Sequence, residues 1–300
     1  MTETTRFNNA QLMCWATYAS VATALVLILV KLVAWFMTDS VSILATLLDS
    51  SLDVLASVVN LIAIHHALQP ADNEHRFGHG KAEALAGIGQ AMFIIGSAGV
   101  LLLQAAGRLV HPQEITSGLD VGLGVMTFSI IATLCLLSFQ KYVIKHTNST
   151  AIKADSLHYK TDLFVNGSVI IALLLSFNGF PYMDAIFGIG IAFFILYSAW
   201  EIVKESIDLL MDHELPDEDR NKIIEVLEND TASLGFHELK TRRSGTRIFV
   251  QLHLELDSTL TLAVAHALAN QIEEKIEALF DDAEVIIHED PVDVSLMKQT

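Results

Sequence analysis

Cysteine is scarce in this sequence, with two residues among 300. Both of them, Cys14 and Cys135, lie in apolar runs, which excludes a disulfide framework and a thiolate metal cluster. No G-x-x-x-x-G-K-[ST] motif occurs, so the sequence gives no support for transport driven by ATP. An H-E-x-x-H motif is missing too, because the H-E-L-K-T segment that starts at His237 lacks the second histidine. This argues against a membrane-embedded zinc hydrolase.

Positive charge is also in short supply, since 18 Lys and Arg stand against 35 Asp and Glu and the net charge is −17. Most of this excess lies near the C-terminal end, where Asp212–Thr300 holds 20 acidic and 8 basic residues and a net charge of −12. Such a surface repels nucleic acid and is compatible with cation binding. Nucleic acid is therefore not expected as a partner.

Long apolar runs dominate the first two-thirds of the chain. Apolar residues make up 52% of the sequence, and the mean hydropathy is +0.46. A helix needs roughly 20 apolar residues to cross a lipid bilayer, and six stretches qualify. They are Leu12–Met37, Val41–Leu68, Ala82–Val110, Val121–Gln140, Leu157–Phe177 and Tyr182–Leu210. The first is too long for a secretion signal, and no A-x-A site follows it. We therefore expect a six-helix transmembrane domain over residues 1–211.

Basic residues gather on one side of these predicted spans. That side carries Arg6, Arg76, Lys81, Lys141, Lys145 and Lys153, whereas the opposite loops carry only Arg108. Positive charge in short loops marks the cytoplasmic face, so both termini are predicted to be cytoplasmic.

Residues 212–300 have the patterns of a water-soluble domain. Two segments have helical periodicity, Asp217–Glu228 and Leu262–Phe280. Three segments read as strands: Phe236–Arg242, Ile248–Leu256 and Ala283–His288. The order α-β-β-α-β predicts a small two-layer α+β domain, with helices over an antiparallel or mixed sheet.

The few ionisable residues inside the predicted spans are informative. Asp49 and Asp53 lie four residues apart in the second span, and His158 and Asp162 lie four apart in the fifth. This spacing puts both side chains of each pair on one helix face, about 6 Å apart along the axis. Counted at about 1.5 Å per residue, the pairs reach similar depths. Two antiparallel helices could then direct three carboxylates and an imidazole to one point.

Four oxygen and nitrogen donors without a thiolate suit a tetrahedral Zn²⁺ site, and Fe²⁺ or Co²⁺ could also be accepted. The alternative is structural hydrogen bonding within the bundle. Each carboxylate costs about 2.5–3.5 kcal/mol or more at mid-membrane, so the sequence favours a transport site. An imidazole binds metal only when it is neutral, so protons and metal would compete, and metal efflux could be coupled to proton entry.

Two further groups of histidines lie outside the spans. Asp72, His75 and His79 fall within one loop, and this pattern fits a metal site and a solvated loop equally well. The soluble domain carries one or two candidate ligands on most of its predicted elements, which favours a metal site over scatter. They are His237, His253, His266, His288 and Asp290. The other histidines are interpreted as ordinary helix-end and interface residues: His65, His66, His111, His146 and His213.

Four motifs together span nearly the whole chain. They are D-S-S-L-D in the second span, H-R-F-G-H-G-K-A-E before the third, A-D-S-L-H-Y-K-T-D in the fifth and H-E-D-P near the end. They resemble the cation diffusion facilitator family, in particular its bacterial zinc and ferrous-iron efflux branch. The resemblance implies a homodimeric Zn²⁺/H⁺ antiporter of the bacterial inner membrane with a ferredoxin-like cytoplasmic domain. Fe²⁺ and Cd²⁺ are further candidate substrates.

The resemblance also implies roles for particular residues. A transport site would comprise Asp49, Asp53, His158 and Asp162, and a loop site would comprise Asp72, His75 and His79. A binuclear site at the dimer interface would comprise His237, His253, His266, His288 and Asp290. A charged pair, Lys81 and Asp212, would hold the helix bundles of the dimer together at their inner ends. The chain departs from the branch at Glu289, where Gln is usual, and this would alter the charge of the binuclear site.

A membrane-anchored metal sensor or storage protein is the competing interpretation. Such a protein would need no carboxylates at mid-membrane, because its cytoplasmic domain alone could bind the ion.

Overall fold

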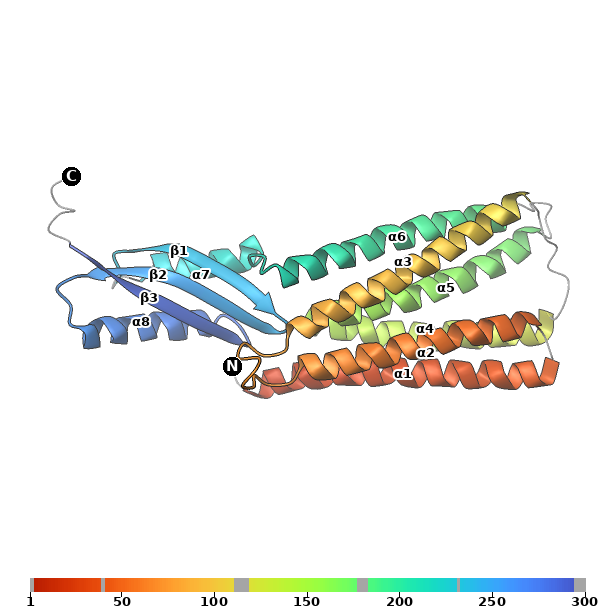
Figure 1. The fold of residues 1–300 in the computed structure, drawn as a ribbon, viewed down its shortest axis with the longest axis horizontal. Helices are drawn as coiled ribbons and strands as arrows, with labels where there is room; N and C mark the ends of the chain where they lie inside the picture. Colours follow the sequence, from red (N-terminus) through yellow and green to blue (C-terminus); the bar gives the residue numbers. More distant parts are fainter. Residues whose placement is uncertain (1–2, 39–40, 111–118, 177–182, 231–232, 294–300) are drawn as a thin grey trace.

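Six long helices and a small sheet domain make up the computed structural model, which describes residues 3–38, 41–110, 119–176, 183–230 and 233–293 (Figure 1). The long helices are α1 Glu3–Thr38, α2 Val41–Ala67, α3 Lys81–Val110, α4 Leu119–Thr147, α5 Thr150–Ser176 and α6 Met183–Leu210. They run side by side along the long axis of the molecule. The sheet domain lies beyond one end of this bundle, the end at which the chain begins.

Five of these helices contain a described stretch that is long and apolar enough to cross a membrane. The stretches are Asn9–Met37, Ser50–Ala67, Lys81–Gly107, Gly124–Thr147 and Ala185–Leu210. The remaining helix, α5, begins at Thr150, seven residues before the predicted span, and its first half carries charged residues such as Lys153 and Asp155. The structure thus has a helix at each of the six predicted spans, and five of these helices have the composition of a membrane span in their described residues.

Small side chains line the contact between α3 and α6 at seven-residue spacing. On α3 these are Ala84, Ala91, Ala98 and Ala105, and on α6 they are Ala185, Ala192, Ala199 and Ser206. All eight are buried. Small residues allow two helix backbones to approach closely where no water-driven hydrophobic effect acts between helices. This alanine seam thus makes α3 and α6 a tightly packed pair.

Helix α5 lies between two groups of helices. Its Ala154 and Leu157 join a buried cluster with residues of α3 and α6. One turn earlier, Ala151 and Ile152 join a second buried cluster with residues of α1, α2 and α4. The side chains of α5 therefore reach the interior of the bundle on both sides, where polar groups can be kept away from lipid.

The C-terminal domain has two helices, α7 Asp217–Glu228 and α8 Leu262–Glu277, and three strands, β1 Gly235–Ser244, β2 Arg247–Asp257 and β3 Ala283–Val292. The sheet has the order β1-β2-β3, with β1 antiparallel and β3 parallel to β2. Leucine, isoleucine and valine side chains from the helices and the sheet form its core. The predicted order and the mixed sheet are confirmed. Strand β3 runs four residues beyond the predicted end at His288.

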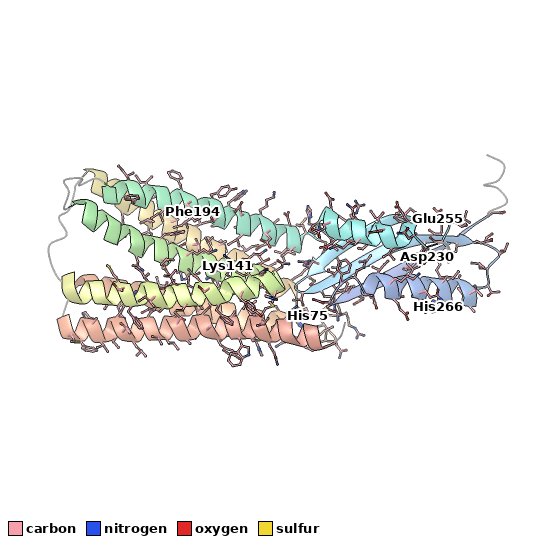
Figure 2. All side chains as sticks on the ribbon, turned by 180° about the vertical axis from the view of Figure 1, so that it is seen from behind. His75, Lys141, Phe194, Asp230, Glu255 and His266 are labelled. Carbon is pink, nitrogen blue, oxygen red and sulfur yellow. The ribbon has the colours of Figure 1, made fainter. Side chains whose placement is uncertain are left out.

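The loop between α2 and α3 packs against the hairpin that joins β1 and β2. The guanidinium of Arg242 lies over the rings of Phe77 and Phe249, at 5.0 and 4.5 Å from the ring centroids. Next to this stack the backbone of Gly80 touches the backbone of the hairpin turn at Ser244 and Gly245. Figure 2 shows His75 of the same loop at this junction, whereas Phe194 lies far from it along α6.

Replacement of Gly80 by alanine should weaken this junction. A Cβ at position 80 would collide with the carbonyl group of Ser244 and would come within 2.8 Å of the Gly245 nitrogen. These are backbone atoms that cannot swing aside, so Gly80→Ala should lower the free energy of unfolding by about 1–3 kcal/mol. The measurement is thermal unfolding of the purified protein in detergent.

Gly89→Ala is the matched control, because a Cβ at Gly89 on α3 would meet nothing within 4 Å. This change should be neutral, or should stabilise the helix by up to about 1 kcal/mol. Equal unfolding temperatures for the two variants would contradict the close approach at Gly80.

Candidate metal sites

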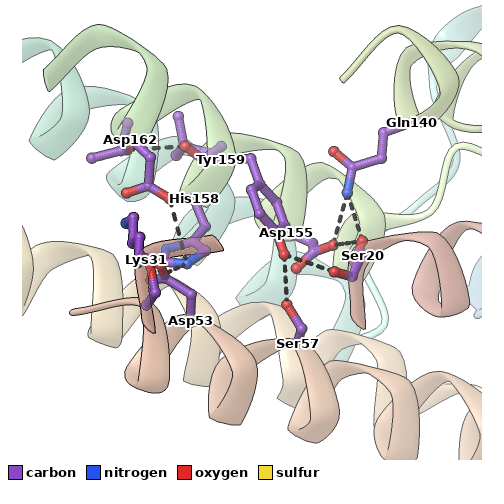
Figure 3. Close-up of polar contacts among 12 residues, drawn as sticks. Ser20, Lys31, Asp53, Ser57, Gln140, Asp155, His158, Tyr159 and Asp162 are labelled. Carbon is purple, nitrogen blue, oxygen red and sulfur yellow. Dashed lines mark hydrogen bonds and ion pairs between the residues drawn. The ribbon is translucent and has the colours of Figure 1, made fainter. Parts of the chain in front are cut away.

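Two antiparallel helices bring the predicted transport-site residues together inside the bundle (Figure 3). Nε2 of His158 on α5 lies 3.1 Å from Oδ1 of Asp53 on α2 and 3.9 Å from Oδ2 of Asp162. The imidazole is buried, and the two carboxylates are partly exposed. Ligands at about 2.0–2.1 Å from one tetrahedral ion stand about 3.3 Å apart. The His158–Asp53 distance is close to this value, and the three donor atoms all lie within 4.8 Å of one another. Asp49 lies one turn before Asp53 on α2, and its side chain is outside the described residues.

A second carboxylate on α5 lies one turn from His158 and was not singled out from the sequence. Asp155 is fully buried, and its Oδ2 accepts hydrogen bonds from Ser20 Oγ at 2.5 Å and Gln140 Nε2 at 2.7 Å. The Tyr159 hydroxyl lies 2.9 Å from Ser57 Oγ, which is one turn from Asp53 on α2. Figure 3 shows this network beside the metal-site cluster. It joins α1, α2, α4 and α5 through polar contacts on one side of the cluster.

The loop between α2 and α3 gathers its predicted ligands around Asp72. Oδ1 of Asp72 lies 3.4 Å from His75 Nδ1, and Oδ2 lies 3.3 Å from His79 Nε2. The backbone N–H of His75 donates to this carboxylate and lowers the pKa of Asp72, as do the N–H of Glu74 and the two imidazoles. Asp72 is therefore ionised at neutral pH, as a metal ligand must be.

A third imidazole stands beside this loop group. The ring centroid of His66, near the end of α2, is 4.7 Å from that of His79, almost the same as the 4.6 Å between His75 and His79. The sequence suggested no role for His66. Helical periodicity cannot show that the chain turns back after Ala67 and returns a histidine to this point.

The sheet of the C-terminal domain aligns three histidines in one row. His253 on β2 pairs with His237 on β1 and with His288 on β3. The ring centroids are 5.0 Å apart for the first pair and 4.6 Å apart for the second. Directly paired residues on adjacent strands point to the same face of a sheet, so the row presents three imidazoles together.

A β-bulge in β1 creates this row. From the hairpin turn the ladder pairs Ser244 with Arg247 and continues to Lys240 with Gln251. A straight continuation would place Glu238 opposite His253. One extra residue in β1 shifts the register, so His237 takes that place. Glu238 lies within the bulge at φ +50°, in the left-handed region that is uncommon for residues other than glycine.

Asp290 is the carboxylate at the centre of the histidine row. Its Oδ2 lies 2.9 Å from His253 Nδ1 and 3.2 Å from His237 Nε2, and its Oδ1 lies 3.3 Å from His288 Nε2. The hydrogen bond from His253 lowers the pKa of Asp290, and the charges of the three imidazoles add to this effect. Oδ2 thus faces His253 and His237, and Oδ1 faces His288. A carboxylate that bridges two metal ions presents its two oxygens in the same way.

His266 lies apart from this row. Its Nδ1 is 3.6 Å from Oε1 of Glu289, and Figure 2 shows it on α8, on the other side of the domain from Glu255. Glu255 accompanies the row itself, with Oε1 3.2 Å from His237 Nδ1. Four of the five residues predicted for this site therefore meet in one chain. The fifth pairs with Glu289, the residue at which the sequence departs from the branch.

Comparison with known proteins identifies the two domains of the chain. Residues 17–211 match the cation efflux transmembrane domain, and residues 215–292 match the cytoplasmic domain of cation efflux proteins. The chain belongs to the cation efflux family. This is a family of membrane transporters of divalent cations rather than enzymes, and the resemblance seen in the sequence motifs is confirmed.

Relatives of this cation efflux protein match over almost their full length. A cation-efflux pump, FieF, of Pectobacterium atrosepticum is 47% identical over 94% of both chains, and one of Serratia proteamaculans is 45% identical over 95% of both. Among solved structures, the metal-bound C-terminal domain of the CzcD transporter from Thermotoga maritima is 31% identical. That match covers 25% of this chain and 87% of the other, with a TM-score of 0.24.

The two residues of the predicted charge pair are in contact in this cation efflux protein. Lys81 Nζ, at the start of α3, lies 2.9 Å from Oδ1 of Asp212, just after α6. Arg242 of β1 lies 3.2 Å from the same oxygen. Partial burial raises the pKa of Asp212, but the two cations outweigh it and keep the pKa below its ordinary value. The sequence suggested Lys81 but not Arg242, because nothing in the order of residues indicates that β1 ends beside α6.

Replacement of Asp290 by asparagine should weaken metal binding in the C-terminal domain. The change keeps the shape of the side chain but removes the negative charge that faces three imidazoles. We expect at least a tenfold loss of Zn²⁺ affinity, on the order seen when groups that support a zinc site are changed. Zn²⁺ titration of the full-length protein by calorimetry measures it.

Asp281→Asn is the control, since Asp281 is an exposed carboxylate in the same domain. Its Zn²⁺ titration should match that of the unchanged protein. An Asp290→Asn protein that bound Zn²⁺ as tightly as the control would show that the histidine row is not a metal site.

Proposed function

We propose that this protein exports divalent metal ions across the bacterial inner membrane, with Zn²⁺ as its main substrate, in exchange for protons. The observation that carries the proposal is the approach of His158 to Asp53 and Asp162 within the helix bundle. Burial of charged groups within the membrane costs free energy, and binding of a cation in transit explains why these groups are present. The name of the relatives, cation-efflux pump, supports the outward direction.

The donor set supports Zn²⁺ and related first-row ions. One imidazole with carboxylates is a borderline-soft set that suits Zn²⁺ and Fe²⁺, whereas Mg²⁺ and Ca²⁺ prefer oxygen alone. Cd²⁺ would be accepted for the same reason. Asp49, one turn from Asp53, completes the proposed set as a fourth donor.

Exchange with protons follows from the chemistry of the same donors. Metal binding requires a neutral imidazole and ionised carboxylates, so protonation of these groups releases the ion. A site that alternately faces each side of the membrane would then carry metal outward and protons inward. No other source of energy is needed, because the proton gradient supplies it.

Topology and assembly complete the proposal. Six helices cross the membrane over residues 1–211, with both termini and residues 212–300 on the cytoplasmic side, where Lys and Arg are frequent in the loops. Two chains form a homodimer through their ferredoxin-like domains. Its binuclear site uses the histidine row, Asp290 and His266, and the Lys81–Asp212 pair ties the inner ends of the helices. Asp72, His75 and His79 bind a further ion beside the junction.

Asp162→Ala should abolish metal transport while leaving a folded protein. The change removes one donor from the transport site. An incomplete site cannot hold the ion while the protein switches the site from one side of the membrane to the other. The assay is Zn²⁺ uptake into sealed proteoliposomes that contain the purified protein. Glu201→Ala on α6 is the control, since it removes an exposed carboxylate of the same domain away from the site, and its rate should match that of the unchanged protein. Normal flux in Asp162→Ala would refute the assignment.

Metal affinity of the transport site should fall as the pH is lowered from about 7.5 to 5.5. Protons compete with the metal for the same imidazole and carboxylates, so a lower pH favours the protonated, metal-free site. Binding of Zn²⁺ measured by calorimetry at several pH values tests this. In His158→Asp the titration should become flatter over this range, and preference should shift toward Mn²⁺, because an all-carboxylate site is harder. An affinity that stays constant in the unchanged protein would contradict proton exchange.

A further inference from the structure

A lysine lies within the first apolar helix, near the transport site. Lys31 belongs to the apolar stretch Asn9–Met37 of α1, six residues before its end. At about 1.5 Å per residue it is roughly 9 Å from that end. An ammonium group so far inside a span is expected either to reach for the membrane surface or to serve a function with a partner.

The contacts of Lys31 indicate the second case. Its Nζ donates a hydrogen bond of 2.6 Å to Oγ of Ser50, a buried residue nine positions into α2. Nine residues of helix amount to about 13 Å, so the ammonium points into the bundle and not toward the outer surface. Figure 3 shows Lys31 beside Asp53 and His158. Ser50 precedes Asp53 by three residues, which is nearly one helix turn.

The charge of Lys31 completes the charge balance of the proposed transport site. The transport site has three carboxylates by sequence, Asp49, Asp53 and Asp162, and one imidazole that must be neutral to bind metal. A divalent ion cancels two of the three negative charges, and the ammonium of Lys31 cancels the third. With Lys31 the loaded site is neutral, and without it one negative charge remains in surroundings of low dielectric constant. Asp155 is not counted as a ligand, because its Oδ2 lies in the network with Ser20 and Gln140 and not among the three donors of the cluster.

We propose that Lys31 is a built-in counter-charge of the transport site. It balances the carboxylate that a divalent ion leaves uncompensated, and so limits how tightly the site holds the ion. The inference rests on the proposed function in one respect only, that the Asp53–His158–Asp162 cluster binds a divalent metal. In this role Lys31 does not touch the metal, but its charge sets how tightly the site binds the ion and how fast the ion is released.

The consequence for transport is a compromise between binding and release. A site with one more negative charge attracts a divalent ion more strongly but lets it go more slowly. At an effective dielectric constant near 20, one unit charge a few ångströms from a divalent ion changes its binding constant by at least about tenfold. Loss of the Lys31 charge should therefore lower KM and kcat together.

The test compares four variants of the full-length protein in lipid nanodiscs. Lys31→Met removes the charge but keeps an unbranched side chain, and Lys31→Arg keeps the charge. Ser50→Ala removes the hydrogen bond and leaves the charge in place. Lys204→Met, at an exposed position of α6, controls for loss of a lysine elsewhere in the membrane domain. Zn²⁺ binding is measured by calorimetry, and the binding step that disappears in Asp162→Ala identifies the membrane site.

We expect Lys31→Met to bind Zn²⁺ at the membrane site at least about tenfold more tightly than the unchanged protein. Lys31→Arg and Lys204→Met should stay within about threefold of it. Ser50→Ala should also change little, because the charge remains. If Lys31 merely ties α1 to α2, Ser50→Ala and Lys31→Met will weaken binding alike, which overturns the proposal. Unchanged affinity in Lys31→Met, with an unfolding temperature close to that of the unchanged protein, overturns it as well.

Failure of the proposed function has a different result. In that case the unchanged protein binds Zn²⁺ at the membrane site but gives no flux in proteoliposomes, and the binding comparison among the Lys31 variants still holds. If flux is normal and Lys31→Met leaves the affinity, KM and kcat all unchanged, transport stands and the counter-charge does not.

Discussion

A carboxylate at the centre of a bilayer costs about 2.5–3.5 kcal/mol or more, and the arrangement of the helices follows from the need to offset that cost. Asp53 and Asp162 flank the imidazole of His158, and Asp155 accepts hydrogen bonds from Ser20 and Gln140. Such pairing is possible because α5 is buried on both sides, against α3 and α6 and against α1, α2 and α4. The charged first half of α5 is therefore buried between these two groups of helices.

The helix bundle and the sheet domain are joined by a compact set of contacts. Lys81 begins α3 and Asp212 follows α6, the two helices of the alanine seam, and Arg242 of β1 contacts the same oxygen of Asp212 as Lys81 does. The guanidinium of the same arginine lies over the rings of Phe77 and Phe249, which meet edge to face. A change in the sheet domain can thus reach α3 and α6 through short, direct contacts.

Local spacing accounts for what could be predicted from the sequence. The four-residue intervals between Asp49 and Asp53 and between His158 and Asp162 follow from helix geometry, and alternation placed His237 and His253 on strands. Contacts that depend on how elements pack could not be found in this way. The contacts of Lys31 with Ser50 and of His66 with His79 each join separate elements of the fold. The bulge at Glu238 depends on strand register, which periodicity leaves open.

The bulge in β1 determines where in the sheet a residue can be deleted without loss of the histidine row. Strand β1 contains one residue more than its ladder with β2 uses, and Glu238 adopts a left-handed conformation to fit it in. Deletion of that residue would straighten the strand and still leave His237 opposite His253. The same deletion in β2, between Ile248 and His253, would move His253 out of line with both of its neighbours. Deletion of one residue therefore preserves the histidine row when it falls at the bulge in β1, but disrupts the row when it falls between Ile248 and His253 in β2.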